Sequence, residues 1–277
     1  MIKRFCCILN LLLIAVIPAS GQFFSWGQDP ASLKWQQINT SNFQIIFPES
    51  FAERAAELAN FLEFHYGPVS SSLGKNPRRV PVIIHNQTVV PNGFVSWAPA
   101  RMELFTNAPP DNDASEWMSR LAIHEFRHVV QVDSLNQGMT AFLSKVLGEW
   151  ITGVSVGLFL PMWLMEGDAV VAETAYTNSG RGRQPHFEQG LRAQTLEKRI
   201  YPYEKAMLGS YKDYVPSYYE LGYQMVASGR AAYGKDIWGN VISYVARKPY
   251  TIFPMSLGMR KYAGLKPSEH YQNTMEQ

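Results

Sequence analysis

The segment His124-Glu125-Phe126-Arg127-His128 constrains this chain more than any other. Two histidines four positions apart project from the same face of a helix, where both imidazoles can bind one metal ion. Glu125 follows the first histidine, so its carboxylate can reach a water on the metal rather than the metal itself. A helix is predicted from Ser115, its N-cap, to Leu135, since no Pro or Gly occurs before Gly138. The alternative is a surface helix whose histidines and glutamate share a solvated face.

Paired histidines beside a glutamate favour zinc as the cofactor. Zinc lowers the pKa of a bound water towards neutrality, and Glu125 would take the proton as that water attacks a carbonyl carbon. Zinc is inferred from the type of ligand, and another divalent ion can occupy such a site in vitro.

The first 21 residues are typical of a secretory signal peptide. Lys3 and Arg4 precede an apolar run over residues 5–17, and Ala19 and Gly21 supply the small residues of a cleavage site. The run is shorter than the about 20 residues of a membrane span. We therefore expect cleavage after Gly21 and a secreted or periplasmic protein. The alternative is an uncleaved anchor.

Composition excludes several classes of protein. Cys6 and Cys7 lie inside the signal, too early for a lipoprotein cleavage site, so we expect neither a lipid anchor nor a disulfide in residues 22–277. The formal charge of +2 falls to zero when Lys3 and Arg4 are removed, and no basic stripe occurs. Nucleic acid is therefore not an expected partner.

Hydrophobic periodicity divides residues 22–277 into an α/β lobe over 22–110 and a helical lobe over 111–277, within a single catalytic domain. The predicted strands are residues 43–47, 80–85, 94–97 and 101–106. The predicted helices are residues 49–66, 162–176, 187–198, 217–228 and 236–247, with a further helix starting at Pro267. Gly67-Pro68 is expected to end the first helix. The order predicts an α+β fold: a small twisted mixed sheet whose edge strand packs on the metal helix, followed by a mostly helical lobe.

Residues 151–165 are uncharged and strongly apolar, but too short for a membrane span. We expect a buried segment or hairpin between the two halves of the active site. The alternative is an exposed apolar flap that contacts a membrane or a partner protein.

A third metal ligand is expected on the helix over residues 162–176. Glu166 lies 38 residues after His128, so its helix can fold back to face the histidines. Gly167 is expected to remove a side chain beside the metal. Glu173 lies on the same helix face as Glu166. Its carboxylate can accept a hydrogen bond from the outer nitrogen of a ligand histidine, the ring nitrogen that does not bind the metal. The alternatives are an acidic residue favoured by the helix dipole for Glu166 and a solvated charge for Glu173.

Residues 124–128 together with Trp163-Leu164-Met165-Glu166-Gly167-Asp168-Ala169 resemble the gluzincin metallopeptidases, in particular the branch related to the M1-type aminopeptidases. That family has HExxH followed on a later helix by WLxEGxA. The resemblance implies a thermolysin-like fold, zinc held by His124, His128 and Glu166, and Glu125 as base and then acid. It also implies an edge strand that pairs with substrate.

Residues 213–222 are similar to the family segment in which a tyrosine stabilises the oxyanion of the tetrahedral intermediate. On that match the phenol belongs to Tyr219, with Tyr223 the next candidate. The chemistry fits, because a phenol with a pKa of about 10 stays protonated and can donate to developing negative charge. The alternative is that both tyrosines only pack in an aromatic-rich helix.

The chain departs from the aminopeptidases in lacking the GxMEN segment that holds a substrate's free amine. Gly93–Pro99 stands in its place, and Glu103 is a poor substitute. We therefore expect cleavage within a peptide chain, with substrate lying antiparallel along residues 101–106.

The other candidate residues are expected to be structural or without a partner. His65 and His85 belong to the ends of a helix and a strand, and His186 and His270 lie in polar surroundings. Arg127 is expected to pair with Asp133 or to face solvent.

The predicted function is that of a secreted zinc metallopeptidase acting on peptides or proteins as an endopeptidase. The alternative is an inactive or non-proteolytic peptidase-like scaffold of a bacterial-type cell envelope, part of a larger multidomain protein. The sequence predicts neither the subsite preference nor the oligomeric state.

Overall fold

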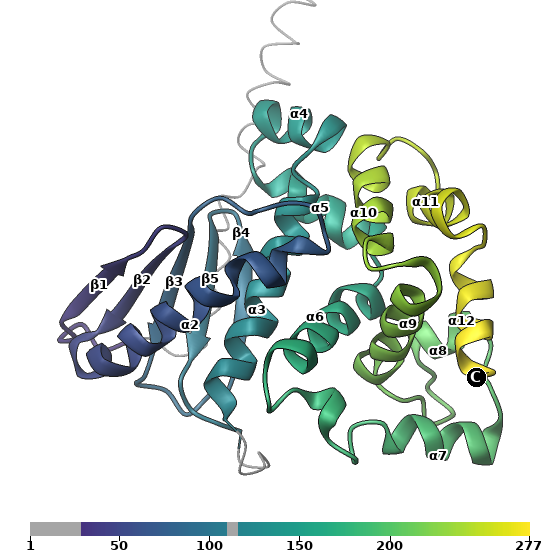
Figure 1. Cartoon of the computed structure of the whole chain (residues 1–277), viewed down its shortest axis with the longest axis horizontal. Coiled ribbons are helices and arrows are strands. Elements are labelled where there is room, and N and C mark those ends of the chain that lie inside the picture. The colour runs from purple at the N-terminus through teal and green to yellow at the C-terminus, as the bar shows by residue number, and fades with distance from the viewer. Residues whose placement is uncertain (1–28, 110–115) are drawn as a thin grey trace, which may run out of the picture.

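The computed structural model describes residues 29–109 and 116–277 (Figure 1). A five-stranded mixed sheet is followed by a mostly helical lobe, and the predicted α+β fold class is confirmed. The expected signal peptide over residues 1–21 and the expected N-cap Ser115 lie outside the described residues.

The sheet has the order β1-β2-β3-β5-β4, in which β2, β3 and β5 run parallel and the outer strands β1 and β4 run antiparallel to their neighbours. The strands are β1 (Trp35–Asn39), β2 (Phe43–Pro48), β3 (Val80–His85), β4 (Gly93–Trp97) and β5 (Ala100–Phe105). Alternate residues of β3 are buried beneath two helices, α2 (Ala52–Ser71) and α3 (Trp117–Ser134) (Figure 1). The sequence does not predict β1, because four of its five side chains are exposed and polar or isolated.

The edge strand beside α3 is β4, so the expectation that substrate pairs along residues 101–106 is wrong. β5 is hydrogen-bonded to β3 on one side and to β4 on the other, and its backbone has no free edge. The hairpin that pairs Trp97 with Ala100 folds β4 to the outside of the sheet. The outermost strand on this side of the sheet is therefore β4, Gly93–Trp97.

Helix α2 continues past Pro68 to Ser71, so the predicted stop at Gly67-Pro68 is wrong. The last turn is retained because it packs on α3: Val69 and Ser70 are buried, and the Val69 carbonyl accepts a hydrogen bond from Arg127. Tertiary contacts outweigh the cost of a proline inside this helix.

The second half of the chain is helical. Its elements are α4 (Gly138–Leu147), α5 (Trp150–Phe159), α6 (Met162–Tyr176), η2 (Arg181–Arg183), α7 (Gln189–Lys198), α8 (Tyr203–Leu208), α9 (Tyr218–Tyr233), α10 (Ile237–Arg247), α11 (Pro254–Ala263) and α12 (Pro267–Met275); η1 (Glu49–Phe51) precedes α2. α6 and α9 cross closely where Gly167 meets Gly222: a Cβ on Gly167 would lie 2.1 Å from the backbone of Gly222. Gly167 therefore allows α9 to approach α6 closely. The expectation that it removes a side chain beside the metal is wrong.

Residues 138–160 form a helical hairpin, α4–α5, that is only partly buried. Thr152, Gly153 and Ser155 are buried, whereas Val154 and Leu158 are exposed. The expectation of a buried segment over residues 151–165 is thus wrong for much of α5 and right for the start of α6, where Trp163 is fully buried.

Among the described helices, none by itself has both the length and the apolar composition to cross a membrane. α5 and α6 meet that test only as a pair, and a 102° bend separates them. Most of α6 is buried in the helical lobe, as expected for a core helix.

Candidate metal centre

Helix α3 carries the HExxH residues and begins at Trp117, capped by Glu116. The Glu116 carboxylate accepts hydrogen bonds from the backbone N–H groups of Met118 and Ser119, at 3.1 and 2.6 Å. An acidic N-cap also matches the positive end of the helix dipole. The helix is buried on most sides, because the sheet and α2 pack on one face and α6 on another. The solvated-face alternative for these histidines is therefore excluded.

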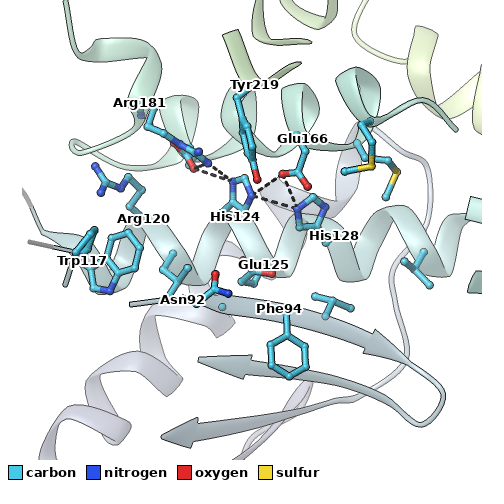
Figure 2. A pocket seen from close by; sticks show the side chains of 18 of the residues that line it. Asn92, Phe94, Trp117, Arg120, His124, Glu125, His128, Glu166, Arg181 and Tyr219 are labelled. Atoms are coloured by element: carbon cyan, nitrogen blue, oxygen red, sulfur yellow. Dashed lines mark hydrogen bonds and ion pairs between the residues drawn. The ribbon is translucent and has the colours of Figure 1, made fainter. Parts of the chain in front are cut away.

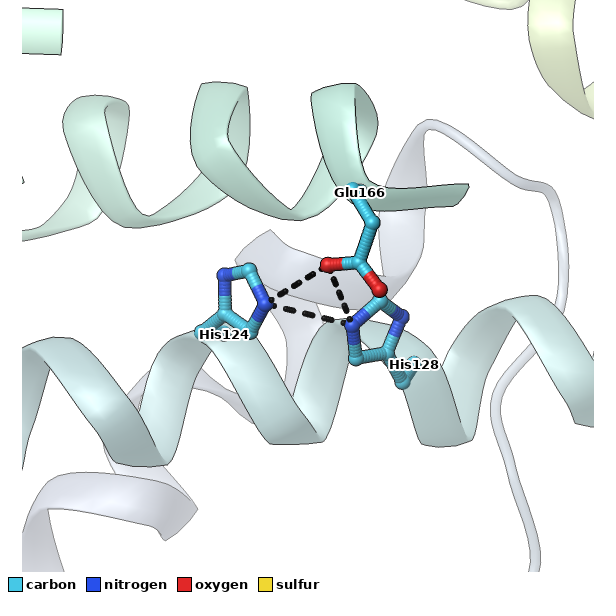
Figure 3. A group of neighbouring side chains, drawn as sticks. All are labelled: His124, His128 and Glu166. Carbon is cyan, nitrogen blue, oxygen red and sulfur yellow. Dashed lines mark hydrogen bonds and ion pairs between the residues drawn. The ribbon is translucent and has the colours of Figure 1, made fainter. Parts of the chain in front are cut away.

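Three side chains from α3 and α6 converge on one point (Figure 3). The Nε2 atoms of His124 and His128 lie 3.2 Å apart, and Glu166 Oε2 lies 3.2 Å from the first and 3.3 Å from the second. Glu166 thus stands where the sequence places the third ligand.

The separations of these three atoms fit zinc. Zinc–ligand bonds of about 2.0–2.1 Å in tetrahedral geometry separate two ligand atoms by about 3.3–3.4 Å. The three measured separations are close to that value, and a tetrahedron would leave one further position facing the cleft. The His-His-Glu group can therefore bind a metal ion, and its ligand type and spacing are consistent with zinc.

Each imidazole has its outer nitrogen held by a second residue. His124 Nδ1 lies 2.9 Å from Glu173 Oε2, and His128 Nδ1 lies 2.8 Å from Gln131 Oε1. Both contacts suit Nδ1–H donors, which would leave the Nε2 lone pairs directed at the common point. Glu173 is buried and stands where the sequence reasoning places it. Gln131 was missed, although it lies one helical turn after His128 on the same face.

Arg181, the first residue of η2, binds the carboxylate of Glu173 from the other side. Its Nε lies 2.8 Å from Glu173 Oε1 and its Nη2 lies 2.9 Å from Oε2, while its backbone N–H donates to Oε1. The guanidinium also approaches His124 Nδ1 at 2.8 Å, because both groups share the same carboxylate. No sequence signal marks Arg181, since it is brought in by a loop whose course depends on tertiary packing.

Arg127 and Asp168 form a buried ion pair behind the metal-binding residues, so the expected pairing of Arg127 with Asp133 or solvent is wrong. Arg127 Nε lies 2.6 Å from Asp168 Oδ2, and both side chains are 1% exposed. Asp168 also accepts from Gln131 at 2.9 Å and from Arg230. This network ties α3, α6 and α9 together and fixes Gln131 against His128.

Glu125 is buried on the side of α3 that faces β4 (Figure 2). A Cβ on Gly93 would lie 2.8 Å from Glu125 Cγ, so a glycine in the edge strand is needed for the two elements to approach this closely. Burial raises the pKa of the Glu125 carboxyl above its ordinary value, against the opposing charges of His124 and His128. A raised pKa suits a group that accepts and returns a proton near neutral pH.

Tyr219 projects from α9 towards Glu166 and His124 (Figure 2). Its ring stacks on the His124 ring at 6.2 Å, and the Arg181 guanidinium lies 4.7 Å from the ring centroid. Burial, together with the Glu166 charge, raises the pKa of the phenol, so it remains a hydrogen-bond donor. Tyr223 instead packs against Phe187 and over Gly182, and of the two phenols only Tyr219 lines the metal-centre cavity.

The charges around the convergent atoms favour a cation. Burial lowers the pKa of His128, but the Glu166 carboxylate outweighs burial and raises it to about 9. For Glu173 the effect of burial has the opposite sign and raises the pKa. The charges of Arg181 and His124 outweigh burial and lower the pKa of Glu173 to about 2. Burial also raises the pKa of Glu166, but the neighbouring His128 and His124 outweigh burial and hold that pKa well below its ordinary value. Glu166 and Glu173 are therefore carboxylates at neutral pH, and their field stabilises positive charge at the imidazoles.

The metal centre opens into a cavity of about 740 Å³. One wall is β4, another is the end of α5 with Met162 and Met165, and the opposite end is lined by Trp117, Arg120 and Arg181. Its size is that of a site for a small ligand or a few residues of a peptide.

The remaining histidines lie apart from the metal centre, except His186, which lines the same cavity. His65 bonds to the Phe61 carbonyl one turn earlier, in agreement with a local role. His270 is buried and lies 2.8 Å from the Met225 carbonyl, so its expected polar surroundings are wrong.

No protein-family model matches the chain, and no curated protein matches it. Among solved structures, the fold is similar to that of an aminopeptidase N family protein from Idiomarina loihiensis, with a TM-score of 0.50 and 10% sequence identity. The similarity covers 88% of this chain but only 46% of the other, so this chain spans about half the length of that protein. At this identity the comparison shows the fold: a mixed sheet and helical lobe of the kind found in the aminopeptidase N family.

Proposed function

We propose that this chain is a zinc-dependent metallopeptidase of gluzincin type that hydrolyses peptide bonds and acts outside the cytoplasm. The observation that carries the proposal is the convergence of His124, His128 and Glu166 at separations of 3.2 to 3.3 Å, with Glu125 beside them. The peptidase-like fold supports it. The signal-like residues 1–21 support the proposed export.

His124, His128 and Glu166 would hold the metal, and Glu173 and Gln131 would orient the two imidazoles. A bound zinc ion supplies a Lewis acid that polarises a carbonyl and lowers the pKa of water. Glu125 takes a proton from the attacking water and delivers it to the leaving amine, and its buried position keeps the carboxylate close to that exchange. Tyr219 donates a hydrogen bond to the oxygen that becomes negatively charged.

The substrate would lie antiparallel along β4, the outermost strand of the sheet and the one that packs on α3. Its backbone would then run beside Gly93–Trp97, and the close approach of Gly93 to Glu125 would bring the scissile bond next to that carboxylate. In this direction, residues that precede the scissile bond extend towards Trp97 and α5. The absence of a GxMEN segment favours an endopeptidase, as the sequence reasoning proposes.

The test is the Glu125→Gln variant, assayed for metal content and for cleavage of unfolded casein. We expect the variant to keep about one zinc per chain and to lose activity by at least about a thousandfold, because a neutral amide cannot take the proton. Wild-type cleavage should stop with a chelator and return with zinc. Full activity in the variant would contradict the mechanism.

A second candidate, a peptidase-like scaffold without catalysis, rests on the same fold and metal site. It would be favoured if the wild type bound one zinc but cleaved neither casein nor any member of a peptide library.

A further inference from the structure

Large apolar side chains gather on the outer face of the α4–α5 hairpin. Among the described residues, 21 large apolar side chains are exposed, and eight of them lie between Met139 and Met162. Six define what we call the α4–α5 apolar face: Phe142, Val146, Leu147, Trp150, Val154 and Leu158, with exposures of 41% to 70%. Figure 1 shows α4 at the upper margin of the described part of the molecule.

The hairpin buries several small or polar residues while large apolar ones stay exposed. Its inward side carries small or polar residues: Thr140, Thr152 and Ser155 are buried, and a Cβ on Gly153 would lie 1.8 Å from the Trp97 indole. The Thr140 hydroxyl donates to the Ala246 carbonyl at 3.1 Å, which satisfies it internally. Val156 and Phe159 pack on the core, and Lys145 and Glu149 are exposed, but most of the exposed side chains of the hairpin are large and apolar, which contact with water does not favour.

A second apolar segment continues from the same region. Gly138, at the start of α4, lies so close to Arg247 that a Cβ there would be 2.9 Å from the Arg247 Cα. From that point the chain runs into a loop in which Tyr250, Ile252 and Phe253 are exposed by 70%, 85% and 71%. A single apolar side chain on a surface is common, but a cluster of this size marks a surface that something covers.

The charges around the apolar residues are mostly positive. The hairpin itself carries only Lys145 and Glu149, and Glu149 pairs with Arg78 at 3.7 Å. The segment from Arg247 to Lys261 contains four cations and no acidic residue. Exposed aromatic and aliphatic side chains edged by lysine and arginine are complementary to a lipid surface with anionic headgroups.

We propose that the α4–α5 apolar face docks on an anionic membrane surface, with Trp150 and Phe142 entering the headgroup region and the nearby cations contacting lipid phosphates. Val156, Gly157 and Met162 line the metal-centre cavity, so docking would bring one wall of the cleft next to the membrane. The inference does not depend on peptidase activity.

The test is sedimentation with vesicles of equal parts phosphatidylglycerol and phosphatidylcholine, using the chain as isolated from cells. The wild type should bind, and Phe142→Glu with Leu158→Glu should weaken binding by at least about tenfold. The matched control is Leu196→Glu with Leu208→Glu, two side chains exposed by 86% and 77% on α7 and α8, which should bind like the wild type. All variants share the same N-terminus, so any contribution of residues 5–17 cancels.

A second set of variants tests the charges. Lys145→Glu with Lys248→Glu should weaken binding to the anionic vesicles, and about 1 M salt should do the same to the wild type, because the Debye length is then about 3 Å. Equal binding to pure phosphatidylcholine, no binding at all, or equal loss in the Leu196 and Leu208 control would overturn the proposal. Dimers in light scattering that disappear in the Phe142 and Leu158 variant, without vesicle binding, would also overturn it and identify a second copy as the occupant.

Discussion

Two clusters in the described part of this molecule place histidine between carboxylates. They differ in whether ring nitrogens of histidine converge on a common point where a metal ion can bind. At the sheet, His85 Nδ1 lies 2.6 Å from Asp29 and its Nε2 lies 3.1 Å from Glu103. Glu103 is in turn paired with Arg101. Both ring nitrogens of His85 and both oxygens of Glu103 have partners within this cluster, so it forms an ion network.

At the metal centre, hydrogen-bond partners hold only the ring nitrogens that face away from the point where the three ligand atoms converge. Glu173 and Gln131 hold the Nδ1 atoms of His124 and His128, and both Nε2 atoms point with Glu166 at one location. The difference teaches that a metal site is recognised by convergence of ligand atoms, and not by the presence of histidines and acids alone.

The largest expected effect distinguishes Glu166 from Glu103. Glu166→Gln should lower zinc affinity by at least about 100-fold, because it removes the only negatively charged member of the His-His-Glu group. Glu103→Gln should leave zinc affinity unchanged, since that carboxylate is committed to His85 and Arg101. Competition with a chromogenic chelator measures both. Equal losses would remove the distinction between the two clusters.

A large effect on stability is expected behind the metal centre. Asp168→Ala should lower the free energy of unfolding by about 3–5 kcal/mol, because it leaves Arg127 buried without its counter-ion. Urea unfolding of the metal-free proteins measures this. Arg192→Gln removes an exposed ion pair with Glu188 and should cost less than about 0.5 kcal/mol. A small effect for Asp168→Ala would mean that the network adds little to the packing of α3 on α6.

Glu173→Ala should have an intermediate effect on metal binding. Residues that orient a ligand histidine typically contribute about 10–100-fold to metal affinity, so the loss should be smaller than for Glu166→Gln. The same zinc competition assay measures it. An unchanged affinity would show that Arg181 or packing alone holds the His124 ring.

The smallest expected effect is the pH dependence of the sheet cluster. Burial lowers the pKa of His85, but the hydrogen bonds that its ring donates to Glu103 and Asp29 outweigh burial and raise the pKa above its ordinary value. A raised folded-state pKa contributes stability below the unfolded pKa of about 6.5, and that contribution is lost as pH rises through the folded pKa. The stability difference between wild type and His85→Gln should therefore be about 1 kcal/mol or less and largest near pH 6. A difference that grows above pH 8 would contradict the assigned charges.

Much of the metal centre could be predicted from sequence because it depends on local geometry. Spacing alone fixes His124 and His128 on one helix face. The second motif identifies Glu166, and helical spacing from Glu166 identifies Glu173. Gln131 was within reach of the same helical argument. Arg181 was not, because a loop brings it to Glu173.

The fold was predicted in outline, and the errors concern tertiary arrangement. Two adjacent short strands were recognised, but which of them lies at the edge depends on sheet order, and β4 rather than β5 is outermost. The apolar run over residues 151–165 was assigned to the interior because sequence shows hydrophobicity and not exposure. In the structure Leu158 is 70% exposed and Trp163 is fully buried.

The central claim is that His124, His128 and Glu166 share one zinc ion. X-ray absorption at the zinc edge tests it most directly on the purified chain. The account predicts a shell of nitrogen and oxygen ligands at about 2.0–2.1 Å with the outer scattering of two imidazoles, reduced to one in His128→Ala. A spectrum without imidazole scattering, or one that His128→Ala leaves unchanged, would contradict it.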